Sequence, residues 1–333
     1  YLIDVIGVDA LIGPATSDQN ESLFPIAEAA DVVIISPSAT SVFLTNIDGA
    51  VSTDQDPGLF WRTVPSDNLQ GYAIAEDMSA RAVTEIAIVH QAGSYGTGLA
   101  DVVLQEFGRF GGGAARFTFN NQSQLTDALV DAANSPGAQE VLFISSEVND
   151  VIAFLSGAEG VDEYNDPLDP LEIFLTDSAA DPIMLQQTSG LLNPQIRGSR
   201  PAVPDSGEYE VFSVAYNIAF SQDPGAAVFA SFSYDAAMLA LYGSAWAHYN
   251  ESDITGTNIA RGLRRVSDLS LPEFGIRGTR YAAGVASFAV GDSLNLTGAS
   301  GPLDFDDVTG ETANPIEVWV VNAARDDFEP VRV

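Results

Sequence analysis

The sequence predicts an α/β fold built on parallel β-sheets, and two observations carry that prediction. Short runs of β-branched and other apolar residues alternate along most of the chain with longer stretches of helical periodicity. The short runs are continuously apolar, which is typical of strands that are buried on both faces of a parallel sheet. The chain has 333 residues, 46% of them hydrophobic, and is therefore long and apolar enough for two domains with large cores.

The alternation is clearest over the first 250 residues. The predicted strands are Asp9–Gly13, Val32–Ser36, Glu85–His90, Glu140–Ser145, Leu171–Thr176 and Glu210–Ala215. The predicted helices are Gln19–Ala30, Leu69–Ala82, Gly98–Phe110, Gln124–Ala133 with Ser123 as its cap, Asn149–Gly157 and Phe232–Tyr249.

The pattern changes after Arg265, where shorter antiparallel strands are expected. These strands are Ser287–Val290, Gly301–Phe305 and Ile316–Val321, with Asp306–Gly310 as the turn between the last two. Two segments rich in proline and glycine, Asp162–Pro170 and Asn193–Asp205, are interpreted as surface loops.

The net charge of −33 makes nucleic-acid binding very unfavourable, because such a field repels phosphate backbones. All thirteen basic residues are arginine. This choice is explained either by a genome that favours arginine codons or by an acidic surface suited to high salt, where ions screen self-repulsion. Neither explanation identifies a ligand.

The sequence gives no support for a metal site, a cofactor or a catalytic centre. It has no cysteine, and its two histidines, His90 and His248, are assigned structural roles. It contains no nucleophile elbow, Walker loop or zinc-protease motif. An enzyme that attacks an amide or acyl group through a serine would need a base nearby, and none is recognised.

The segments that follow the predicted strands are the candidate binding loops, because ligands of open parallel sheets bind beyond the carboxyl ends of the strands. The loops Pro14–Asp18, Pro37–Ser41 and Gln91–Gly98 are rich in hydroxyl groups and lead into helices, which suits a carboxylate. Asp177 follows a later strand and suits an ammonium group. Together they would match an amino acid.

Each of these residues also has a structural interpretation. Ser17 and Thr40 are typical helix N-cap residues. Asp177 could be a cap or a solvated charge, and Tyr95 could be a packing aromatic.

Several segments, in the same order and spacing, resemble the type I periplasmic solute-binding proteins. The branch is the one that binds leucine, isoleucine and valine for ABC importers. The segments are ALIGPATS at 10–17, IISPSAT at 34–40, FWRTVPSD at 60–67, IAIVH at 86–90 with SYGTGLA at 94–100, and SYDA at 233–236. The resemblance covers about residues 1–250.

The resemblance implies two α/β lobes, each a parallel sheet flanked by helices, joined by three crossovers and closing on ligand like a flytrap. It places residues 1–115 and 228–295 in the N-terminal lobe, and residues 116–227 and 296–333 in the C-terminal lobe. Tyr1–Ile6 looks like the end of a helix that other elements precede in the family, so this lobe is expected to lack its first strand and helix.

The resemblance also implies roles for individual residues. Ser17 and Thr40 would bind the ligand's α-carboxylate, and Asp177 its α-ammonium. The remaining positions implied to face the ligand are Ser38, Ala39, Tyr95, Glu147 and Phe229. Glu147 departs from the aromatic residue that is usual in the family, so it favours a polar or cationic ligand side chain or points to solvent.

The implied function is an extracytoplasmic protein, periplasmic or attached to the cell surface, that captures an amino acid and delivers it to an ABC permease. The implied protein is a monomer that uses no cofactor. A stand-alone ligand-sensing receptor domain of the same fold is the alternative, and these residues do not separate the two.

The first prediction concerns salt. Because the net charge is −33, self-repulsion opposes the compact state, and screening should relieve it. We expect the melting temperature to rise between dilute buffer and molar potassium chloride, as followed by circular dichroism. A flat or falling melting temperature would leave codon usage as the explanation for the missing lysine.

Overall fold

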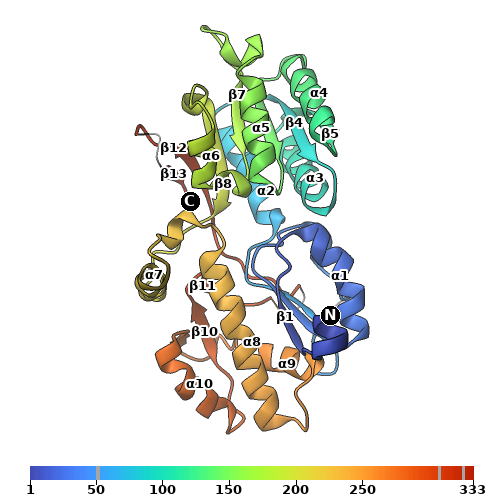
Figure 1. The fold of residues 1–333 in the computed structure, drawn as a ribbon, viewed down its shortest axis with the longest axis vertical. Coiled ribbons are helices and arrows are strands. Elements are labelled where there is room, and N and C mark those ends of the chain that lie inside the picture. Colours follow the sequence, from blue (N-terminus) through green and yellow to red (C-terminus); the bar gives the residue numbers. More distant parts are fainter. Residues whose placement is uncertain (50–52, 307–308, 325–326) are drawn as a thin grey trace. The chain divides into compact units, whose positions relative to one another are not determined.

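The computed structural model describes residues 1–49, 53–306, 309–324 and 327–333 (Figure 1). The chain folds into two compact units. Unit 1 comprises Tyr1–Ser66, Val203–Gly225 and Phe229–Asn314, and unit 2 comprises Asp67–Ala202, Ala226–Val228 and Pro315–Val333. Apart from the short excursion at 226–228, the chain passes between the units three times.

Unit 1 contains two small sheets and their helices. The first sheet is parallel, in the order β1-β2-β3, and the second has the order β11-β10-β9. The strands are β1 (Ala10–Ile12), β2 (Val33–Ser36), β3 (Phe60–Arg62), β9 (Glu273–Gly275), β10 (Asn295–Gly298) and β11 (Gly301–Pro302). The helices are η1 (Leu2–Ile6), α1 (Ser17–Ala29), η2 (Val42–Leu44), α7 (Gly207–Phe220), η6 (Pro224–Ala226, which runs into unit 2), α8 (Ala230–Asn250), α9 (Gly256–Leu263), η7 (Gly278–Arg280) and α10 (Tyr281–Phe288).

Strand β2 is buried on both faces, as its continuous apolar run predicts. Val33 and Ile35 belong to a cluster with residues of α8 and α9, such as Leu239 and Ile259. Ile34 points to the other side and belongs to a cluster with α1. The alternation of side chains along a strand therefore gives unit 1 two cores, one on each face of β2.

Unit 2 is built on a seven-stranded sheet of the order β13-β12-β8-β7-β6-β4-β5. The strands are β4 (Glu85–Gln91), β5 (Gly113–Phe119), β6 (Glu140–Ile144), β7 (Glu172–Leu175), β8 (Ile196–Pro201), β12 (Ile316–Val321) and β13 (Phe328–Arg332). The pairs from β5 to β8 are parallel, and β12 and β13 add antiparallel strands at one edge. The helices are α2 (Asp67–Ala80), α3 (Ser94–Arg109), α4 (Gln122–Ala133), α5 (Val148–Ala158), η3 (Asp162–Asn165), η4 (Asp177–Ala179), α6 (Pro182–Gln187) and η5 (Asn193–Gln195).

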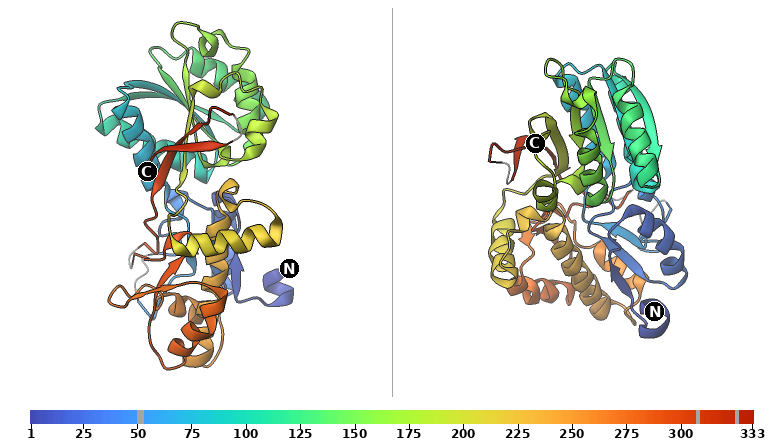
Figure 2. Two further views of the ribbon diagram at one scale, coloured as in Figure 1. Left: turned by 90° about the vertical axis from the view of Figure 1, so that its left-hand side faces the viewer. Right: turned by 45° about the horizontal axis from the view of Figure 1, so that its top comes forward.

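Helices cover both faces of this sheet (Figures 1 and 2). Val141 and Phe143 of β6 pack in a cluster with α4 and α5, where the rings of Phe143 and Phe154 stack with centroids 4.4 Å apart. Leu142 and Ile144 face the opposite cluster, with residues of α2 and α3. The α/β architecture predicted from the continuous apolar runs is therefore confirmed.

The predicted strand Glu210–Ala215 is wrong, because these residues lie inside α7. The Ser206 side chain caps this helix by accepting a hydrogen bond from the Tyr209 N–H at 3.1 Å. Its apolar residues are largely exposed, with only Phe212 buried. The β-branched run is thus an exposed helix face and not a buried strand.

Three further predictions are wrong in part or in full. Ser287 and Phe288 end α10, so Ser287–Val290 is not a strand. Asn193–Asp205 is not a surface loop throughout, because it contains β8, which lies between β7 and β12 in the sheet. Gln124–Ala133 is helical as predicted, but Asn121, not Ser123, is the cap of α4.

The predicted hairpin near the C-terminus is also wrong. Of Gly301–Phe305, only Gly301–Pro302 is a strand, and it pairs with β10 in unit 1. Ile316–Val321 is a strand as predicted, but it pairs with β8 and β13 in unit 2. Asp306–Gly310 therefore does not connect two paired strands, and its residues 307 and 308 lie outside the described part of the chain.

The boundaries between the two units differ from the lobe boundaries expected from the resemblance. The resemblance places residues 1–115 and 228–295 in the N-terminal lobe, and residues 116–227 and 296–333 in the C-terminal lobe. Strand β4 pairs residue by residue with β5 and β6, so residues 67–115 lie in unit 2. The pairing of β10 with β9 and β11 keeps the chain in unit 1 as far as Asn314.

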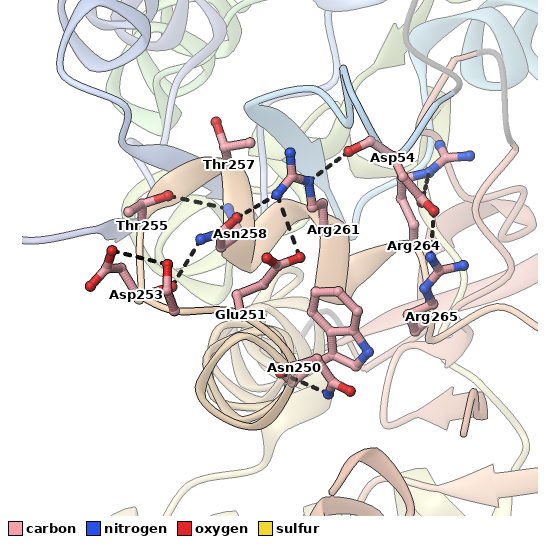
Figure 3. A network of polar contacts seen from close by, with 12 residues as sticks. Asp54, Asn250, Glu251, Asp253, Thr255, Thr257, Asn258, Arg261, Arg264 and Arg265 are labelled. Atoms are coloured by element: carbon pink, nitrogen blue, oxygen red, sulfur yellow. Dashed lines mark hydrogen bonds and ion pairs between the residues drawn. The ribbon is translucent and has the colours of Figure 1, made fainter. Parts of the chain in front are cut away.

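Arginines anchor the acidic chain at several points, and the densest group lies on and after α9 (Figure 3). The Arg261 Nε donates to the backbone oxygen of Asp54 at 2.6 Å, and Arg265 forms an ion pair with its carboxylate at 2.5 Å. Arg264 approaches the same carboxylate at 3.6 Å, and Arg265 also lies over the ring of Trp246. Asp54 thereby fixes its segment to α9.

No helix within the described residues is long and apolar enough to cross a membrane.

Asp235 connects α8 to the turn between β10 and β11. It is fully buried and accepts hydrogen bonds from the Ala299 N–H at 2.9 Å and the Ser300 N–H at 2.7 Å, as well as from the Ser300 hydroxyl. A Cβ on Gly298 would lie 2.1 Å from the carboxylate, so glycine is needed there for the approach. Burial raises the pKa of Asp235 to about 6, against these hydrogen bonds, which lower it.

We expect Asp235→Ala to lower the free energy of unfolding by about 3 kcal/mol at pH 4, because two buried N–H groups lose their acceptor. Between the ordinary pKa of 3.8 and about 6, the folded state holds the proton more tightly than the unfolded state. The carboxyl group's contribution to stability therefore falls as the pH rises through this window, and the loss in the variant should shrink. Urea unfolding at pH 4, 5, 6 and 7 measures it. A loss of equal size at every pH would contradict the assignment.

Candidate ligand-binding site

The residues predicted to bind ligand lie in both units. In unit 1, Ser17 is the first residue of α1, the loop after β2 carries Ser38, Ala39 and Thr40, and Phe229 precedes α8. In unit 2, the segments after β4, β6 and β7 carry Tyr95, Glu147 and Asp177.

The N-cap interpretation of Ser17 and Thr40 is wrong. Thr16 caps α1: its hydroxyl accepts from the Gln19 N–H at 3.3 Å, and the Gln19 side chain accepts from the Thr16 N–H. Ser41 caps the short helix η2 by accepting from the Phe43 N–H. Ser17 and Thr40 are each one residue away from the capping position.

The two loops of unit 1 are joined by hydrogen bonds. The Ser17 hydroxyl accepts from the Ser41 N–H at 3.2 Å, and the Ser38 hydroxyl donates to the Ala15 oxygen at 2.7 Å. The Ala39 N–H donates to the hydroxyl of Ser36 at the end of β2. These bonds hold the backbone that surrounds Thr40 in one conformation.

Arg62 is a supporting residue that the sequence analysis did not single out. It is 1% exposed, and it donates to the backbone oxygens of Ala39 at 3.0 Å and Ser41 at 2.9 Å. Its second nitrogen reaches the hydroxyl of Thr45 and forms an ion pair with Glu311. A lone arginine ending a buried strand, directly after Phe60 and Trp61, was the available signal.

Thr40 is buried, with 2% of its surface exposed, yet its hydroxyl has no hydrogen-bond partner among the described residues. Leaving a buried hydroxyl without a partner costs about 1–3 kcal/mol, so such groups call for an explanation. Unit 1 therefore offers an unused hydroxyl in a rigid loop.

Phe229 is half-buried just before α8, and its ring centroid lies 6.3 Å from that of Phe232.

In unit 2 the structure brings Tyr95 and Asp177 together. Tyr95 lies in the first turn of α3, Asp177 begins η4 after β7, and the Tyr95 hydroxyl donates to Asp177 Oδ1. Gln70 of α2 donates to the same oxygen at 3.4 Å. Asp177 is only 7% exposed, so its interpretation as a solvated charge is wrong.

Burial sets the protonation of this pair. It raises the pKa of Asp177, while the hydrogen bonds from Tyr95 and Gln70 lower it. The pKa of Tyr95 lies well above its usual value because of burial and because of the negative charges of Asp177 and Asp67. Tyr95 thus remains a neutral donor. The buried Asp67, at the start of α2, is a further acid of this region that the sequence analysis missed.

Glu147 is exposed and precedes α5, without a hydrogen bond from its side chain to the helix end. Its backbone N–H donates to the Ser145 hydroxyl at 3.1 Å. Within the described residues, its carboxylate makes no polar contact with Tyr95 or Asp177. In the same part of the chain, no group of three or more histidines and acids is placed to hold a metal ion.

Each unit presents its own binding chemistry. Unit 1 offers hydroxyl groups next to a helix N-terminus, which favour an anion, and unit 2 offers a buried carboxylate that favours a cation.

Comparisons with known proteins agree with this architecture. Residues 2–160 match the family described as the receptor family ligand binding region. Among curated proteins no match was found.

Three solved structures with the same fold have 15–18% sequence identity with this chain. The leucine-binding protein LivK of Thermotoga maritima has a TM-score of 0.73 at 18% identity, over 98% of this chain and 81% of its own. The branched-chain amino acid binding protein LivJ of Streptococcus pneumoniae, in complex with isoleucine, has a TM-score of 0.67 at 17% identity, over 100% and 82%. A solute-binding protein of R. palustris, in complex with benzoate, has a TM-score of 0.72 at 15% identity, over 99% and 79%.

These matches extend over 98–100% of this chain. The resemblance to the branched-chain amino acid binding proteins is therefore confirmed as a likeness of fold. The chain has the two-lobed α/β fold of the type I periplasmic binding proteins.

Proposed function

We propose that this protein is an extracytoplasmic solute-binding protein that captures an amino acid, branched-chain or similar, and delivers it to an ABC importer. The observation that carries the proposal is the hydroxyl of Thr40, which is buried without a partner while the complementary acid, Asp177, is buried in unit 2. A zwitterion would satisfy both groups. The leucine and isoleucine named for two structural relatives support this ligand class.

The residue roles follow from the same chemistry. Ser17, Ser38, Ala39 and Thr40 form the carboxylate-binding loops, and Thr40 supplies the unused donor. Asp177 binds the ammonium group, because a buried carboxylate is stabilised by a cation. The ligand side chain contacts Tyr95, Glu147 and Phe229.

A ligand-sensing receptor domain is the second candidate function. It is favoured by the match of residues 2–160 to a receptor ligand-binding family. Both functions use the same ligand site and differ in the partner, which is a permease in one case and a signalling protein in the other. Genes for a permease and an ATPase beside this one would favour transport. We propose that the protein works as a monomer in either case.

We expect free L-amino acids to raise the melting temperature, while the matching carboxylic acids without an ammonium group do so much less. A ligand at a hundred times its dissociation constant adds about 2.7 kcal/mol to the free energy of unfolding. A panel of the common L-amino acids, with 4-methylpentanoate and benzoate as comparison ligands, measures the effect by thermal shift. Stabilisation by the carboxylates alone would replace the amino acid with a simple carboxylate as the ligand.

We expect Thr40→Val to change stability and affinity in opposite directions. Removing a buried hydroxyl without a partner should raise the free energy of unfolding of the unliganded protein by up to about 1 kcal/mol. It should also weaken amino-acid binding about tenfold, the equivalent of one hydrogen bond. Chemical unfolding and calorimetric titration measure the two effects.

Thr257→Val is the matched control, because the Thr257 hydroxyl donates to the Asp31 carboxylate at 2.6 Å within unit 1. This control should lose stability and keep the affinity. If Thr40→Val instead loses stability and keeps the affinity, Thr40 has a structural partner and not a ligand.

A further inference from the structure

Gln70 occupies an unusual position beside Asp177. It is 1% exposed, and its side-chain nitrogen donates both to Asp177 Oδ1 at 3.4 Å and to the Ser199 hydroxyl at 3.1 Å. Ser199 lies on β8 in the seven-stranded sheet and is fully buried. The side-chain amide of Gln70 therefore donates to Ser199 in the sheet and, at the same time, to the Asp177 carboxylate.

The two oxygens of Asp177 are treated differently. Oδ1 accepts hydrogen bonds from both Tyr95 and Gln70. Within the described residues, no side chain donates to Oδ2. The two side-chain donors, with the backbone N–H of Asp177 as a further donor to the carboxylate, hold it in one orientation and leave Oδ2 without a side-chain donor.

We propose that Gln70 is a positioning residue that holds Asp177 as an oriented carboxylate for the ammonium group of the ligand. The proposal rests on the function proposed above. It assigns to Gln70 no contact with the ligand.

The choice of neutral donors supports this role. Gln70 and Tyr95 stabilise the ionised carboxylate without cancelling its charge. An arginine in the same place would form an ion pair with Asp177 and compete with the ammonium group. With neutral donors the full negative charge of Asp177 remains for the ligand, in a buried setting where a charge-assisted hydrogen bond is strong.

Other charged groups on the neighbouring elements are paired, are exposed or act through Tyr95. Asp67 of α2 raises the pKa of Tyr95, and Asp150 of α5 accepts from the Ser145 hydroxyl at 2.8 Å. Glu147 at the start of α5 is exposed. On β8, Arg197 pairs with Asp77 and Arg200 with Glu317. The hydrogen bonds from Gln70 and Tyr95 are thus the direct side-chain influences on Asp177 that lower its pKa against burial.

The first test is the pH dependence of L-leucine binding to the wild-type protein and to Gln70→Met, which keeps the size of the side chain and removes the donor. As the pH is lowered and Asp177 takes up a proton, the affinity for L-leucine should fall, and this part of the pH profile is called the acid limb. Because Gln70 lowers the pKa of Asp177, its loss should move this acid limb upward by about one pH unit. At neutral pH the affinity should fall about tenfold. An unmoved acid limb with unchanged affinity would overturn the proposal.

Gln139→Met is the matched control in unit 2. The Gln139 side chain accepts from the Thr84 N–H at 2.7 Å, away from Asp177, so its loss should leave the acid limb unmoved. Asp177→Asn should abolish the acid limb in both the wild-type and the Gln70→Met backgrounds.

The second test needs no ligand and separates failure of this proposal from failure of the proposed function. The free energy of unfolding is measured from pH 4 to 8 for wild type, Gln70→Met, Asp177→Asn and the double variant. Because Gln70 stabilises the ionised carboxylate, its loss should cost more as the pH rises through the titration of Asp177. In the Asp177→Asn background the cost should not depend on pH. A cost that is equal at every pH and in both backgrounds assigns Gln70 to packing and overturns the proposal, whether or not leucine binds.

Discussion

Parallel strand pairing is the constraint on which the rest of this structure depends. In unit 2 it sets β4, β6 and β7 side by side in one direction, so that the segments after them leave the sheet at the same edge. Tyr95 and Asp177, 82 residues apart in the sequence, meet there through a hydrogen bond. In unit 1 the parallel pairing of β1 with β2 places the Pro14–Ser17 and Pro37–Ser41 loops together in the same way.

The buried arginines then fix what the strands bring together. Arg62 donates to two backbone oxygens of the Pro37–Ser41 loop and pairs with Glu311. Arg200 forms a buried pair with Glu317 across β8 and β12. A guanidinium group presents several donors in one plane, so a single side chain can satisfy separate acceptors, which a lysine ammonium on a flexible stem does less well. The absence of lysine therefore does not weaken these anchors, whatever caused it.

Local sequence predicted the elements whose apolar pattern agrees with their burial. The runs at β2, β4, β6 and β7 are buried on both faces and were recognised for that reason. Strand β8, with the sequence IRGSRP, was not, because its residues look like those of a loop. Its Gly198 is explained only by a distant neighbour: a Cβ there would lie 2.1 Å from the ring of Trp319 on β12. The opposite failure, at 210–215, came from an apolar run that remains exposed on α7.

The candidate site shows the same limit. Thr40 and Asp177 were predicted from their place after strands, because that signal is local. Gln70 and Arg62 were missed, because what they do depends on partners such as Asp177 and Glu311, 107 and 249 residues away. Both oxygens of Asp235 have backbone donors, which is typical of a structural acid. The side-chain donors to Asp177 share one oxygen, and Thr40 has no partner among the described residues, so these two groups retain the capacity to bind a ligand.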